Sequence, residues 1–114
     1  IASVRAFFDA AKRENKTIAG YGAAAKGNTL LNACGATAAD LAYVVDSNPH
    51  KQGLFLPSTH VPVCAPDRIA ETKPDYVLIL PWNLKDEIVR QTKQISGWGG
   101  RFAVPIPELS VFDA

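Results

Sequence analysis

The chain has 114 residues, of which 47% are hydrophobic and 20% are charged, and its formal net charge is +1. This length and balance predict a single globular domain, over residues 1–114, with a core of its own. The charge excludes a chain-wide basic surface and no apolar run approaches the roughly 20 residues of a membrane span, so we expect a cytoplasmic protein without nucleic-acid or membrane partners.

The first half of the chain alternates between helical and extended patterns. A first helix is predicted because apolar residues recur at helical spacing, at Val4, Phe7, Phe8 and Ala11. A short strand over 17–19 then leads into a glycine-rich turn and a helix over about 24–33, which Gly35 ends. A second strand is expected over 42–46, with Asp46 as its last residue.

The second half repeats this alternation after a turn-rich loop over 47–58. We expect a short strand over 60–63, confined to an edge by Pro62, and a short helix over 68–72. The run over 75–80 is apolar at every position except Asp75, which is typical of a strand buried on both faces of a parallel sheet. A helix over 84–95 and a last strand over 102–104 complete the pattern, and the acidic pair at 86–87 is assigned to that helix's solvated face.

Strands that alternate with helices predict an α/β fold. We expect a Rossmann-like, doubly wound sheet of about five mainly parallel strands with helices on both faces. In such a sheet, ligands bind beyond the carboxyl ends of the strands, near the point where the strand order reverses. Four segments are expected on that edge: the glycine turn, Asp46 with its loop, the loop before His60, and Pro81-Trp82-Asn83.

The glycine turn is the first candidate binding segment, and its pattern is Gly-x-Gly-x-x-Ala with Ala25 in the last place. Small residues let the backbone approach a ligand, and the free N–H groups at the start of the next helix favour a phosphate. The alternative is that these residues only permit a tight turn. The candidate ligand-binding residues in this segment are Gly20, Gly22, Ala23, Ala24, Lys26, Gly27 and Asn28.

The other candidate binding residues follow later strands. Asp46 is placed to accept hydrogen bonds from ribose or sugar hydroxyls, and Asn48 and Lys51 lie in the loop after it. Lys51 is either a solvated cation or a phosphate contact. Trp82 either packs in the core or stacks on a base or sugar, and Asn83 either caps the following helix or contacts the ligand.

Neither catalytic nor metal-binding residues are predicted. His50 and His60 have no neighbouring carboxylate or serine that would make a nucleophile and base visible in the sequence. Cys34 and Cys64 stand alone, without the spacing of a metal site, and are expected to be reduced thiols. A nucleotide-shaped pocket without a visible catalyst indicates half of an active site.

Five blocks of sequence carry a resemblance to a known family. They cover residues 20–32, 46–53, 59–63, 74–83 and 105–107, which read GYGAAAKGNTLLN, DSNPHKQG, THVPV, PDYVLILPWN and PIP. In order and spacing these blocks resemble the C-terminal domain of S-adenosylmethionine-dependent sugar C-methyltransferases, which build branched deoxysugars on nucleoside diphosphates. The resemblance spans nearly the whole chain, with one departure at Ser58, where the family more often has glycine.

The resemblance implies that this chain is one part of a three-part enzyme, and the absence of methionine also leads us to expect a piece of a longer protein. The family has a zinc-binding N-terminal region and a central domain that holds S-adenosylmethionine and the acid and base residues. The implied partners are a nucleoside diphosphate-sugar and that central methyltransferase domain, with the sugar nucleotide between the two domains. No cofactor is then expected on this domain itself.

The implied reaction removes a proton next to a sugar keto group, and the resulting carbon nucleophile attacks the methyl group of S-adenosylmethionine. This domain would contribute orientation of the substrate and exclusion of water. Two other functions stay open on the residues alone. One is a free-standing NAD- or CoA-binding module, favoured by the glycine pattern and Asp46, and the other is a structural or dimerisation domain whose turn binds no ligand.

Overall fold

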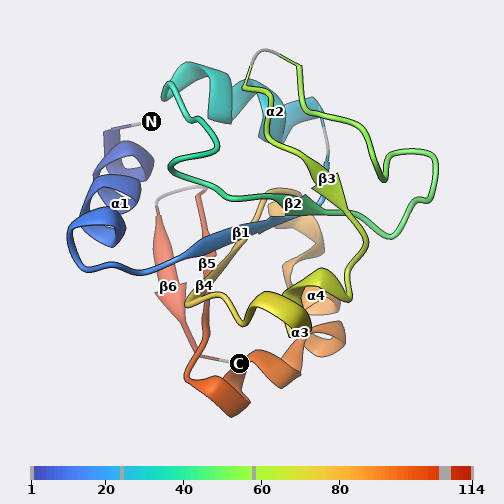
Figure 1. Cartoon of the computed structure of the whole chain (residues 1–114). Helices are drawn as coiled ribbons and strands as arrows, with labels where there is room; N and C mark the ends of the chain where they lie inside the picture. Colours follow the sequence, from blue (N-terminus) through green and yellow to red (C-terminus); the bar gives the residue numbers. More distant parts are fainter. Residues whose placement is uncertain (1, 24, 58, 106–108, 114) are drawn as a thin grey trace.

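The structure of the chain is a computed structural model that describes residues 2–23, 25–57, 59–105 and 109–113. Its centre is a six-stranded sheet (Figure 1). In chain order the strands are β1 (Ile18–Tyr21), β2 (Val44–Val45), β3 (Val63–Cys64), β4 (Tyr76–Ile79), β5 (Arg101–Val104) and β6 (Ser110–Phe112).

The strands lie in the spatial order β3-β2-β1-β4-β5-β6, and this order makes the sheet doubly wound. The first five strands are parallel, and β6 pairs antiparallel with β5. The chain builds the sheet outward in one direction from β1 to β3, then returns to the other side of β1 for β4. The order therefore reverses between β1 and β4, which is where an α/β sheet of this kind binds its ligands.

Helices cover both faces of the sheet, as predicted (Figure 1). One face carries the helices α1 (Ala2–Arg13) and α2 (Ala25–Ala33), and its core includes Phe8, Leu31 and Leu78. The opposite face carries α3 (Arg68–Thr72), α4 (Lys85–Gln91) and the 3-10 helix η2 (Lys93–Trp98), with Ile69, Ile79 and Ile88 in its core. A short 3-10 turn, η1 (Trp82–Leu84), joins β4 to α4.

Several elements differ from the prediction. The strand expected over 42–46 is the shorter β2, which ends before Asp46, and the strand expected over 60–63 begins only at Val63. The expected helix over 84–95 is broken, because α4 ends at Gln91 and the chain continues as η2. The buried Thr92 side chain donates a hydrogen bond of 2.7 Å to the Ile88 carbonyl, and the Thr92 backbone has left the helical region at φ −123°. The last strand is β6 rather than β5, and its three residues are too few to give a strand pattern in the sequence.

A buried carboxylate fixes α1 to the segment after α2. The Asp40 side chain is 3% exposed and accepts hydrogen bonds from the guanidinium of Arg5 at 2.6 Å and the N–H of Thr37 at 3.1 Å, while the Lys12 ammonium lies 2.7 Å away. Burial opposes ionisation of this group, but the hydrogen bonds from Arg5 and Lys12 outweigh it and lower the pKa of Asp40 to about 2. The ion pair therefore stabilises the face that carries α1 and α2.

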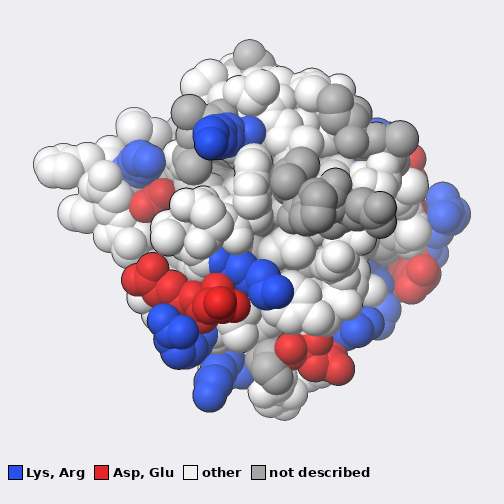
Figure 2. All heavy atoms as spheres, turned by 180° about the vertical axis from the view of Figure 1, so that it is seen from behind, with Lys and Arg blue, Asp and Glu red and all other residues white. Residues whose placement is uncertain are grey.

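The surface has no broad region of one charge on the face seen in Figure 2, where acidic and basic side chains are interspersed between uncharged ones. Within the described ranges, no helix combines the length and the apolar character needed to cross a membrane.

Candidate functional site

A cavity of about 240 Å³ lies at the carboxyl edge of the sheet, at the point where the strand order reverses. Tyr21 ends β1, Asp46 follows β2 and Pro81 follows the strand β4, so three neighbouring strands deliver these residues to one place. We call this cavity the carboxyl-edge pocket, and its lining residues are Tyr21, Gly22, Ala23, Asp46, Ser47, Lys51, Pro81, Leu84, Glu87, Ile88 and Gln91.

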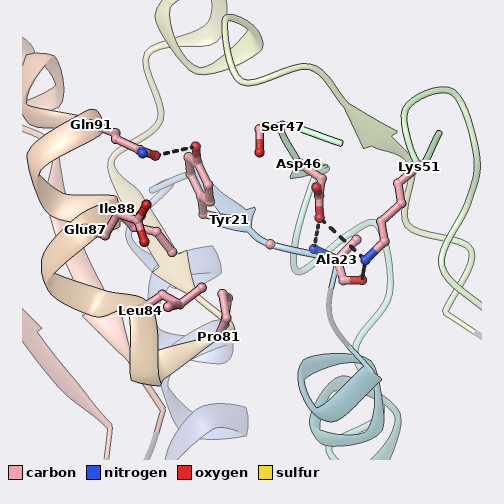
Figure 3. Close-up of a pocket in the computed structure, with 11 residues that line it drawn as sticks. Tyr21, Ala23, Asp46, Ser47, Lys51, Pro81, Leu84, Glu87, Ile88 and Gln91 are labelled. Carbon is pink, nitrogen blue, oxygen red and sulfur yellow. Dashed lines mark hydrogen bonds and ion pairs between the residues drawn. The ribbon is translucent and has the colours of Figure 1, made fainter. Parts of the chain in front are cut away.

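The pocket has two walls, which face each other across Tyr21 (Figure 3). One wall is the face of η1 and α4 that carries Leu84, Glu87, Ile88 and Gln91, which are spaced by three or four residues and so share one side of the helix. The other wall is the start of the loop after β2, with Asp46, Ser47 and Lys51. Enclosing pockets for small molecules measure about 300–1,000 Å³, so these walls form a shallow site.

Tyr21 and Gln91 join the floor of the pocket to the α4 wall. The Tyr21 hydroxyl donates a hydrogen bond of 3.4 Å to the Gln91 side-chain oxygen. Burial, followed by the nearby carboxylates of Asp46 and Glu87, raises the pKa of Tyr21 above its ordinary value. The phenol is therefore protonated at neutral pH and sits in a locally negative environment.

The glycine turn uses its own amides to hold the sheet edge together. The Gly22 N–H donates to the Val45 carbonyl at 2.7 Å, and the Ala23 N–H donates to Asp46 Oδ2 at 2.8 Å. Gly22 has φ +94°, and a Cβ on it would overlap the ring of Pro81. Glycine is thus required at position 22 by the turn and its packing, independently of any ligand.

Asp46 is the centre of a small network at the pocket wall. In addition to the Ala23 amide, its carboxylate accepts the Asn48 N–H at 2.9 Å, and the Lys51 ammonium lies 4.0 Å from Asp46 Oδ2. Lys51 also donates to the Ala23 carbonyl at 3.1 Å, and its side chain remains 45% exposed (Figure 3). The network fixes the loop after β2 against the glycine turn.

Two other glycines of the turn region have packing roles. A Cβ on Gly20 would lie 2.9 Å from Val44 on the neighbouring strand β2, and a Cβ on Gly27 would lie 2.7 Å from the Cβ of Leu80. Gly27 therefore permits the close approach of α2 to the sheet. The side chain of Ala25 and the whole of Ala24 lie outside the described part of the structure.

Seven of the described residues predicted for the site do not line the pocket, namely Gly20, Lys26, Gly27, Asn28, Asn48, Trp82 and Asn83. Lys26 is exposed on the first turn of α2, and the partly buried Asn28 has a side-chain oxygen without a hydrogen-bond partner among the described residues. Trp82 is half-buried and Asn83 is exposed in η1. The alternative role of Asn83 as a helix cap is wrong, because the residue in the N-cap position of α4 is Leu84.

None of the four residues of the α4 wall was predicted as a binding residue from the sequence. Asp86 and Glu87 are both exposed, as predicted, but Glu87 also lines the pocket and Asp86 does not. The signal was available in part, since Glu87 lies three residues after Leu84 and therefore on the same side of the helix. The residues that line the pocket but were not predicted are Tyr21, Ser47, Pro81, Leu84, Glu87, Ile88 and Gln91.

A second cavity, also of about 240 Å³, lies at the opposite, amino edge of the sheet, where Ile18 begins β1 and Pro74 precedes β4. Its most polar lining residue, Arg68, is already paired with Glu71 at 3.1 Å. The carboxyl-edge pocket has the richer chemistry, with two carboxylates, an amide, hydroxyls and an ammonium. It holds neither histidine nor cysteine, so its side chains are suited to binding a polar ligand.

Two comparisons with known proteins identify the family of the chain. The sequence model of a family described as the C-methyltransferase C-terminal domain matches residues 2–107. The C-methyltransferase NovU of Streptomyces niveus is 41% identical over 113 residues, which cover 99% of this chain and 27% of NovU. The chain thus spans little more than a quarter of that relative.

Proposed function

The chain belongs to the C-methyltransferase C-terminal domain family, and on that premise we propose that it is the substrate-side domain of an S-adenosylmethionine-dependent C-methyltransferase. Its ligand is a nucleoside diphosphate that carries a keto-deoxysugar. The observation that carries this proposal is the carboxyl-edge pocket, which lies at the reversal point of the sheet and contains hydrogen-bonding groups but no nucleophile and base pair.

The shape of the pocket supports a shared active site. With about 240 Å³ between two walls, it is too small to enclose a sugar nucleotide, so a second surface must complete the site. In NovU nearly three quarters of the chain lies outside the matched region, which leaves ample length for the domain that supplies this surface. We assign S-adenosylmethionine, the methyl donor, and the structural zinc of the family to that other part of the protein.

On this proposal the residues of the chain bind and orient the substrate. Leu84 and Ile88 provide an apolar surface for the ring, and the acceptor groups of Asp46, Glu87 and Gln91 fix its rotation. Holding the reacting carbon in line with the donated methyl group, and keeping water from it, are the contributions that such a domain makes to the rate.

The test uses the full-length protein that contains this chain, with thymidine diphosphate-glucose as the probe. Leu84 is 45% exposed at the pocket mouth, so Leu84→Trp should fold and fill the mouth. Leu54→Trp is the matched control, because Leu54 is 57% exposed and lies outside the pocket. We expect Leu84→Trp to raise the Kd for the probe at least fivefold, with less than a twofold change for Leu54→Trp.

The Kd values are measured by isothermal titration calorimetry, and the same titrations are made with S-adenosylmethionine and NADH. The Kd for S-adenosylmethionine should stay within twofold in both variants, because that ligand binds elsewhere. Tight NADH binding that Leu84→Trp abolishes would identify a dinucleotide module instead. If the probe binds and Leu84→Trp leaves its Kd unchanged, this edge is a structural surface and the proposed function is wrong.

A further inference from the structure

The proposed ligand has a sugar at one end and a nucleoside at the other, joined by a diphosphate, and the lining of the carboxyl-edge pocket indicates which part it binds. The inference below rests on the proposed function. We propose that the pocket receives the hydroxyl-bearing sugar ring and that the diphosphate lies outside it. A glycine turn before a helix ordinarily binds the phosphate of a ligand. In this chain the sugar ring, and not the phosphate, would lie beside the turn.

The first argument is that two amides of the turn, those of Gly22 and Ala23, already have acceptors. In a phosphate-binding turn the backbone N–H groups point at the ligand. Here the Gly22 N–H is bonded to the Val45 carbonyl, and the Ala23 N–H is bonded to Asp46 Oδ2 at 2.8 Å. The Asp46 carboxylate therefore occupies the place of an anion at Ala23, and a phosphate would have to displace it.

The second argument is the charge of the pocket. Asp46 and Glu87 are the acidic lining residues, and Lys51 is the basic one. The Lys51 ammonium is also committed, since it lies 4.0 Å from Asp46 Oδ2 and donates to the Ala23 carbonyl. A diphosphate placed here would meet a surface with an excess of negative charge, which repels it.

The third argument is the match between the pocket's groups and sugar hydroxyls. Carboxylates only accept hydrogen bonds, and hydroxyls both donate and accept. Asp46 and Glu87 lie on opposite sides of Tyr21, one on each wall of the pocket (Figure 3), so each wall offers a carboxylate to the hydroxyls of a ligand. Leu84 and Ile88 lie beside Glu87 and offer an apolar surface to the C–H groups of the ring.

The experiment compares two ligands in the full-length protein, thymidine diphosphate-glucose and thymidine diphosphate. Glu87→Gln removes the negative charge and one strong acceptor from the α4 wall. Asp86→Asn is the matched control, because Asp86 is the adjacent exposed acid on the same helix and does not line the pocket. Both positions are exposed, so neither substitution should disturb folding.

We expect Glu87→Gln to weaken binding of thymidine diphosphate-glucose by about three- to tenfold, because a hydrogen bond to a charged carboxylate is replaced by a weaker one to the neutral amide oxygen. Binding of thymidine diphosphate should change less than twofold, and Asp86→Asn should change neither affinity by more than twofold. If only the sugar contacts Glu87, then Glu87→Gln raises the Kd for thymidine diphosphate-glucose relative to the Kd for thymidine diphosphate. The ratio of these two Kd values, compared between the variant and the wild type, is therefore the quantity to measure.

If the diphosphate and not the sugar lay in the pocket, Glu87→Gln would change the affinity in the opposite direction. If the diphosphate occupied the pocket, removal of the Glu87 charge would tighten both ligands, and this result overturns the inference. Equal weakening of both ligands would place the nucleoside in the pocket, and no change in either would leave Glu87 without a ligand contact, so both outcomes also overturn it. In each of these cases a weakening of the sugar nucleotide by Leu84→Trp would leave the proposed function intact.

Discussion

Gly22→Ala and Gly53→Ala form a matched pair that tests why the turn needs glycine. The two residues have nearly equal positive φ values, +94° and +85°. A Cβ on Gly22 would overlap the ring of Pro81, whereas a Cβ on Gly53 would meet no atom within 4 Å. Both substitutions incur the backbone strain of a left-handed conformation, but only Gly22→Ala adds a collision.

The expected magnitudes follow from these two contributions. Left-handed backbone costs a residue with a Cβ about 1–2 kcal/mol, which we expect for Gly53→Ala. Overpacking adds about 1–3 kcal/mol, so Gly22→Ala should reduce the free energy of unfolding by about 2–5 kcal/mol. Urea denaturation followed by circular dichroism measures both losses, and the melting temperatures should fall by about 4 °C for each kcal/mol.

An equal decrease in the free energy of unfolding in the two variants would refute this reasoning. It would show that the Pro81 ring can move away from the new Cβ without loss of stability. If the difference is found, a binding defect of Gly22→Ala has a structural cause and carries no information about ligand contact. Substitutions on the α4 wall, such as those at Leu84 and Glu87, are then the informative probes of the site.

Two further predictions concern stability and thiol reactivity. Because the pKa of Asp40 is lowered from 3.8 to about 2, its ionised form should contribute about 2 kcal/mol, present in full above about pH 4 and lost as the pH falls to about 2. Asp40→Asn should therefore be less stable than the wild type in urea at pH 6, and the difference should shrink by pH 2; a constant difference would contradict the assigned pKa. Cys34 is buried and burial raises its pKa, whereas Cys64 is half-buried, so Ellman's reagent should titrate Cys64 in the native chain and both thiols in denaturant, and rapid native reaction of Cys34 would contradict this.

The sequence predicted the fold where the local pattern and the tertiary environment agree. The run over 75–80 is apolar at every position but one, and it forms the central strand β4 with Val77 and Leu78 packed in opposite cores. Gly35 ends α2 at φ +67°, and Pro62 precedes β3, which is an edge strand. Each of these features depends on one residue's own backbone or burial preference, which a sequence shows directly.

The composition of the site could be predicted only in part, because it depends on contacts between distant residues. The sequence led to Asp46 and to the carboxyl edge of the sheet. It did not show that the Asp46 carboxylate binds the Ala23 amide 23 residues away, because no spacing rule describes that contact. The break at Thr92 was hidden for a similar reason, since Ile95 remains buried in η2 and preserves the helical period.

The central claim is that the carboxyl-edge pocket is the sugar-nucleotide surface of this domain. The most direct measurement is methyl NMR of the full-length protein, labelled at isoleucine and leucine, during a titration with thymidine diphosphate-glucose. We predict that the methyl signals of Leu84 and Ile88 shift, while those of Ile18, at the amino-edge cavity, do not. Shifts at Ile18 with unchanged signals from Leu84 and Ile88 would contradict the account.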